Sequence, residues 1–176
     1  WRMGNPVNTL LQASQEFNVD LILLGALKRE NVVKFYLGSI ARKITRRAKC
    51  SVLLLINPSV DRRPCQHIVV NGFDNPQTKD TIEAAFMVAK ALGSKKISLV
   101  EEISPSKVDV AVDDDRSLRR ATLKKERLRR QEQTRVKDVV EKLHAKLTCD
   151  INWDTQSIFG RRGYSIGHYA KVVRAD

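Results

Sequence analysis

The chain has 176 residues, of which 42% are hydrophobic and 30% charged, so it suits one ordinary domain or two small ones with a packed core. Its longest apolar runs, 21–24 and 52–56, are too short to cross a bilayer, and its first residues do not read as a signal peptide. Three widely spaced cysteines without a C-x-x-C pair argue against a disulfide framework or a zinc site. We therefore expect a cytoplasmic location and no insertion of this stretch into a membrane.

The net charge of +12 comes mainly from one segment. Residues 116–147 contain twelve Lys or Arg against four Asp or Glu, a net charge of +8, so the rest of the chain shares only +4. Charge concentrated in this way indicates one basic surface rather than a protein that is basic throughout.

The first sixty residues predict two helices that alternate with two strands. Apolar residues recur at helical spacing in the helices, and the strands are short continuous apolar runs. Such runs are typical of parallel strands buried on both faces. The expected elements are a helix over 5–17, a strand over 21–24, a helix that begins at Gly38 and Ser39, and a strand over 52–56.

The alternation continues beyond a linker that we expect over 59–64. The elements predicted after it are a strand over 68–70, a helix over 78–92, a strand over 96–100, a long basic helix over about 116–147, a weaker strand over 149–153 and a helix over 164–173. Strands that alternate with helices predict an α/β fold, here a parallel five-stranded sheet with helices on both faces.

The long basic helix divides into two halves. Its second half has an apolar face, whereas the leucines of its first half recur every five residues, so we expect a packed C-terminal half and a solvated or partner-seeking N-terminal half. The residues that could contact nucleic acid or an anionic surface are Arg119, Arg120, Lys124, Lys125, Arg129 and Arg130. The stretch lacks aromatic residues and includes glutamates, so a solvated helix is favoured over a nucleic-acid partner.

Two pieces of the sequence resemble the universal stress protein family. The nucleotide signature of that family is a glycine, two residues, a glycine, nine residues, a glycine and then Ser or Thr. Gly25, Lys28, Gly38 and Ser39 stand at these spacings, and the segment 68–92 resembles the first strand and helix of the family. The resemblance implies a Rossmann-like fold of the adenine-nucleotide alpha hydrolase-like type.

The two pieces occur in the reverse of the family's order, and residues 163–176 echo residues 4–20. This order predicts a piece of a tandem protein, in which residues 1–58 form the late half of one domain and residues 65–176 the early part of the next. Such a chain completes a sheet by circular permutation or by strand exchange with a second copy. The expected partner is therefore another domain of the same chain or a second copy in a homodimer.

The resemblance also implies a nucleotide site with two departures. In nucleotide-binding members, glycines let backbone N–H groups approach the phosphates, and an Asp at the end of the first strand helps to hold the nucleoside. Here Lys28 replaces the middle glycine, and Phe73 takes the position of the Asp, with Asp74 one residue later. The motif is degenerate, and ATP or another adenine nucleotide is the candidate cofactor. The candidate binding residues are Gly25, Lys28, Gly38, Ser39 and Asp74.

The residues do not predict catalysis or a metal site. The three histidines lack metal-ligand spacing and no G-x-S-x-G motif is present, so no residue is assigned a catalytic or metal-binding role. The resemblance implies a non-catalytic regulatory or ligand-sensing module. Two alternatives stay open: the cytosolic regulatory tail of a membrane transporter such as a cation/proton antiporter, within one polypeptide, and a nucleic-acid-binding accessory protein that uses the basic helix.

Overall fold

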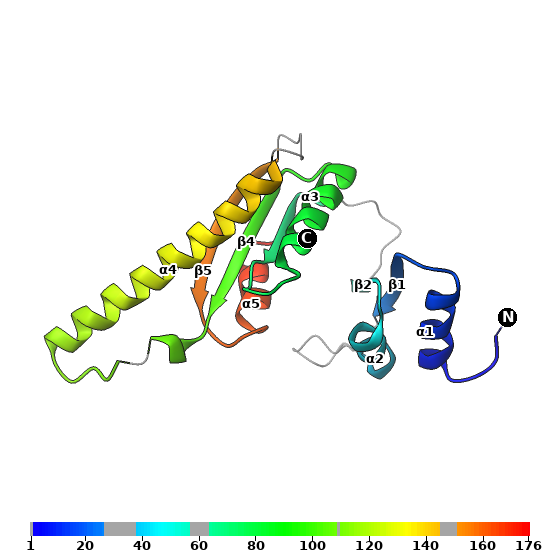
Figure 1. Cartoon of the computed structure of the whole chain (residues 1–176), viewed down its shortest axis with the longest axis horizontal. Coiled ribbons are helices and arrows are strands. Elements are labelled where there is room, and N and C mark those ends of the chain that lie inside the picture. Colours follow the sequence, from blue (N-terminus) through cyan, green and yellow to red (C-terminus); the bar gives the residue numbers. More distant parts are fainter. Residues whose placement is uncertain (1, 27–37, 57–63, 109, 145–150) are drawn as a thin grey trace. The chain divides into compact units, whose positions relative to one another are not determined.

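The chain forms two compact units, Trp1–Arg62 and Arg63–Asp176, in a computed structural model (Figure 1). The structure describes residues 2–26, 38–56, 64–108, 110–144 and 151–176. Apart from Pro64, the linker expected over 59–64 lies outside the described residues.

The first unit contains two helices and a two-stranded parallel sheet. Its elements are α1 (Pro6–Glu16), β1 (Leu21–Ala26), α2 (Ser39–Arg47) and β2 (Ser51–Ile56). The two strands pair in register, with Leu21 opposite Ser51. A small core joins both helices to β1 through Val7, Leu11, Ile22 and Ile44.

The prediction that these two strands are buried on both faces is wrong for this unit. Ile22 is only 8% exposed, whereas its neighbours Leu21 and Leu23 are 49% and 58% exposed. Leu53 and Leu55 of β2 are exposed as well. The core formed with α1 and α2 includes Ile22, so the helices cover one side of the sheet. Burial therefore alternates along the strands, as in a sheet with one covered face.

A side chain caps the N-terminus of α1. The Oδ1 atom of Asn5 accepts hydrogen bonds from the backbone N–H groups of Val7 and Asn8, at 3.0 and 3.4 Å. We expect Asn5→Ala to lower the free energy of unfolding of the first unit by about 1 kcal/mol. Asn5→Gly should lower it by only a few tenths of a kcal/mol. Hydrogen exchange of the α1 amides reports on this unit alone. Equal exchange rates in the two variants would contradict the capping role.

The second unit has a three-stranded parallel sheet in the order β3-β4-β5. Its elements are β3 (His67–Asn71), α3 (Thr78–Leu92), β4 (Lys96–Ile103), η1 (Pro105–Lys107), α4 (Asp115–His144), β5 (Asn152–Phe159) and α5 (Ser165–Val172). On one face, α3 and α4 pack on the sheet. The buried side chains of this core are Val70, Ile82, Phe86, Ala89, Ile97, Leu99, Val136, Val140 and Leu143.

The central strand β4 is buried along almost its whole length. Ile97 and Leu99 belong to the core formed with α3 and α4. Successive side chains alternate between the two faces of a strand, so Glu101 lies on the same side and Glu102 on the opposite side. The carboxylate of Glu102 accepts hydrogen bonds from the N–H groups of Gly163 and Ile166, at 2.6 and 2.7 Å, and so caps the start of α5. Helices therefore cover both faces of this sheet.

The predicted α/β class with parallel strands is confirmed, but the five strands form two sheets, one in each unit. The strand expected over 149–153 instead covers Asn152–Phe159, because it pairs with all eight residues of β4, from Lys96 to Ile103. The polar residues of β5 conceal this length in the sequence. The long helix runs over Asp115–His144, and its packed half contains Val136 and Val140 as expected.

Candidate functional site

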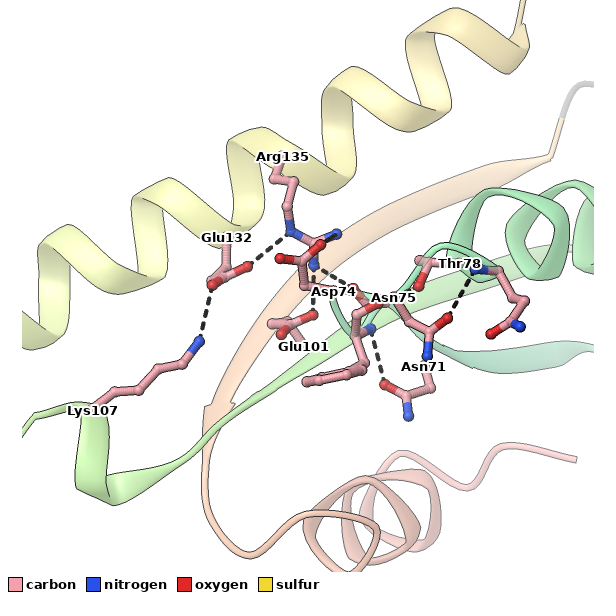
Figure 2. A network of polar contacts seen from close by, with 11 residues as sticks. Asn71, Asp74, Asn75, Thr78, Glu101, Lys107, Glu132 and Arg135 are labelled. Atoms are coloured by element: carbon pink, nitrogen blue, oxygen red, sulfur yellow. Dashed lines mark hydrogen bonds and ion pairs between the residues drawn. The ribbon is translucent and has the colours of Figure 1, made fainter.

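A cluster of charged side chains lies where β3 and β4 approach α4 (Figure 2). Arg135 of α4 is its centre, and its guanidinium donates to the carbonyl oxygen of Gly72 at 2.5 Å and to the carboxylate of Glu101 at 2.8 Å. The Nε atom of Arg135 also donates to the carboxylate of Glu132 at 2.9 Å. Lys107 contacts Glu132 from the other side at 3.5 Å. One arginine thus links the sheet to one turn of the helix.

Glu101 is the most deeply buried acid of this cluster, with 2% of its surface exposed. Burial raises the pKa of its carboxyl to about 7, while Arg135 acts in the opposite direction and the nearby Glu132 adds to the rise. A buried carboxylate is costly without a partner, so Arg135 stabilises the charged form of Glu101.

The loop after β3 directs Asp74 toward α4. Asp74 is largely exposed and forms an ion pair with Arg135 at 3.7 Å. Phe73, one residue earlier, packs against the guanidinium of Arg162, whose central carbon is 3.5 Å from the ring centroid. The hydroxyl of Thr78 donates to the carbonyl oxygen of Phe73 and fixes the start of α3 against this loop. Asp74 therefore belongs to the Arg135 cluster.

The glycines of the nucleotide motif lie in the first unit. Gly25 is in β1, Gly38 precedes α2, and Ser39 is the first residue of that helix. A Cβ atom at Gly25 or Gly38 would meet no atom of the described residues within 4 Å, and neither glycine has a positive φ. Gly38 is the N-cap residue of α2, and it has no side chain that could cap the first backbone N–H groups of the helix. Lys28 lies outside the described residues, and Asp74 belongs to the second unit.

The six basic residues singled out in the sequence do not share one face of α4. Arg120, Lys124 and Arg130 line an open hollow together with Arg127 of the same basic segment. Arg129 instead lies 5.1 Å from the ring centroid of Phe159 in β5. Lys125, four residues before Arg129, is on the same side of the helix, and Arg119 is exposed.

The cluster around Arg135 is not predicted from the sequence. Its acids come from a strand, a loop and a helix that are far apart in the sequence, and Arg135 is one of many basic residues in its segment. The alternation of Glu101 and Glu102 along a strand was the available signal, since it places one acid on each face.

Within the described residues, no three His, Cys, Asp or Glu side chains are arranged to hold a metal ion. The described helices also include none with the length and apolarity needed to cross a membrane.

Comparison with known proteins finds a family match within the first unit. The model of the universal stress protein family matches residues 2–55. This segment of the first unit is therefore similar to the universal stress protein family. No curated protein sequence matches the chain. Among solved structures, a universal stress protein from Archaeoglobus fulgidus DSM 4304 is similar, with a TM-score of 0.63 and 17% identity over 98% of this chain.

The chain spans about half of that universal stress protein, since the likeness covers 53% of its length. At this identity the likeness shows the fold alone. The likeness in fold extends beyond the matched segment 2–55 and includes residues of both units.

Proposed function

We propose that the chain is a non-catalytic regulatory or ligand-sensing module of the universal stress protein type, located in the cytoplasm, with a degenerate site for an adenine nucleotide. The observation that carries this proposal is the signature spacing of Gly25, Gly38 and Ser39 in a segment that matches the family. The described residues of the first unit leave room for a Cβ at either glycine, so close approach of a ligand is a better reason for these glycines than packing against those residues.

The middle position of the motif opposes phosphate binding. Lys28 brings a Cβ and a long side chain to the place where a glycine would let the backbone approach a phosphate. Its ammonium group attracts phosphate only as a flexible point charge. Binding that depends on several backbone N–H groups is therefore weakened.

The acidic position of the motif is also altered. Asp74 stands one residue late and is paired with Arg135, while Phe73 is held by Arg162. A carboxylate that pairs with an arginine must give up that contact before it can accept hydrogen bonds from a ribose. Both departures support a module in which regulation no longer depends on tight ATP binding.

The variant Lys28→Gly tests whether Lys28 limits nucleotide binding. We expect the variant to bind ATP at least about tenfold more tightly than the wild type, because the backbone regains access to the phosphates. Calorimetric titration with ATP, ADP and AMP in the presence of magnesium measures this change. Lys49→Gly, in the bend after α2, is the matched control and should leave binding unchanged. Equal affinities of the wild type and Lys28→Gly would contradict the role given to Lys28.

We further propose that the chain works within a tandem arrangement of such modules. The support is that it aligns over 98% of its own length with only 53% of one universal stress protein chain. The second proposed setting for such a tandem arrangement is the cytosolic tail of a membrane transporter. Sequence upstream of the chain tests it, because about a dozen apolar spans would assign the module to a transporter and none would assign it to a free tandem protein.

A further inference from the structure

The N-terminal half of α4 extends past the sheet of its own unit (Figure 1). Thirty helical residues span about 45 Å, whereas the eight-residue strands β4 and β5 span only about 26 Å. The buried residues of α4 confirm the difference, since Val136, Val140 and Leu143 lie in its C-terminal half and Ala121 is the main buried residue of the first turns. The extension is therefore a largely solvated helix.

One side of this extension carries a row of positive charges, here called the basic stripe. Its members are Arg120, Lys124, Arg127 and Arg130, which line the same hollow and lie three or four residues apart. Glu126 is the acid beside them. Among the described residues, no acidic side chain forms an ion pair with a member of the stripe. Like charges at this spacing destabilise a helix, so a counter-charge would stabilise it.

The row has a linear charge density close to that of one DNA strand. From Arg120 to Arg130 the helix rises by about 15 Å, and duplex DNA carries about four phosphates of one strand over that length of its axis. We infer that the basic stripe binds the phosphates of duplex DNA without reading its sequence. This inference goes beyond the proposed regulatory role and does not depend on nucleotide binding in the first unit.

The side chains around the stripe favour a duplex over other anionic partners. The described residues that line the hollow include no aromatic side chain on which bases of a single strand could stack. Among these described lining residues Leu123 is the one apolar side chain, which is too little for insertion into a lipid surface. A helix fits the major groove of B-form DNA, whereas the major groove of A-form RNA is too narrow.

Fluorescence anisotropy with a labelled duplex of about 20 base pairs tests the inference through its salt dependence. Four phosphate contacts predict a slope of about −3.6 for the logarithm of the binding constant against the logarithm of salt concentration, or about a hundredfold loss over a fourfold rise in salt. The triple variant Arg120→Gln, Lys124→Gln, Arg127→Gln should bring the slope to about −0.9. Glutamine preserves helix propensity, and circular dichroism of the variant verifies that α4 is retained.

The control removes the same charge from another surface. Lys79→Gln, Lys90→Gln and Lys95→Gln neutralise three exposed lysines on or next to α3 and should leave the slope near its wild-type value. An equal reduction by both triple variants would overturn the inference, because it would show that only net charge matters. Tighter binding to phosphatidylserine vesicles or to single-stranded DNA than to the duplex would overturn it as well.

Discussion

Replacement of Arg135 by methionine lowers the free energy of unfolding of the second unit by about 3–5 kcal/mol at about pH 8, because it leaves a buried charge without its partner. The charge is that of Glu101, which is 2% exposed and bonded to Arg135 at 2.8 Å. Methionine retains much of the apolar stem of arginine, so the loss comes chiefly from the removed guanidinium.

The loss for Arg135→Met should be much smaller at about pH 5.5, since Glu101 then takes up a proton and the unpaired charge disappears. Urea unfolding in a Trp1→Phe background, in which Trp153 of β5 reports on the second unit, measures both values. Lys137→Met changes an exposed residue two positions later and should have little effect at either pH. A loss that is the same at both pH values would show that Arg135 contributes through packing alone.

Glu101 itself should impose a pH dependence on the stability of the second unit. Its pKa is about 7 in the folded protein against an ordinary value of 4.5, so the folded state binds more protons than the unfolded state between these values. The free energy of unfolding therefore falls as pH rises through this window, by about 3 kcal/mol in total at 1.36 kcal/mol per pKa unit. Stability from this group is greatest below about pH 4.5 and is lost above about pH 7.

Glu101→Gln removes the titration while it keeps an oxygen that can accept from Arg135. We expect the variant to be more stable than the wild type at about pH 8 and similar to it at about pH 4.5, with no decline between them from this site. Urea unfolding across the pH range, with the exposed Glu141→Gln as control, measures the difference. Parallel profiles for Glu101→Gln and the wild type would contradict the burial argument.

Much of the fold follows from local pattern. The helix predicted over 78–92 is observed as Thr78–Leu92 and ends at Gly93, whose φ of 69° suits glycine. The helix that starts after Gly38 is also where its apolar stripe indicates, with Ala41 and Ile44 buried. These elements are recognisable because each combines a periodic apolar face with a terminating residue.

The structure differs from the sequence-based predictions where contacts between distant segments determine burial or strand length. The exposed face of β1 and β2 depends on which helices pack on their sheet, and an apolar run such as Leu21–Leu24 does not contain that information. The length of β5 is set by the ladder with β4 rather than by its own polar residues.

One part of the candidate site is a local motif that the sequence shows, and another part depends on contacts between distant residues. The spacing of Gly25, Gly38 and Ser39 is visible in the sequence and agrees with the family match. The pairing of Asp74 with Arg135 is not, because 61 positions separate the two residues (135 − 74) and only the packing of α4 on the sheet brings them together.

The measurement that tests the central proposal most directly is a calorimetric titration of the wild-type chain with ATP and magnesium. A degenerate motif, with Lys28 at the middle glycine position and Asp74 paired to Arg135, predicts no saturable heat below millimolar ATP. Saturable binding at micromolar ATP would contradict the proposal, because it would show that the altered motif still forms a tight nucleotide site.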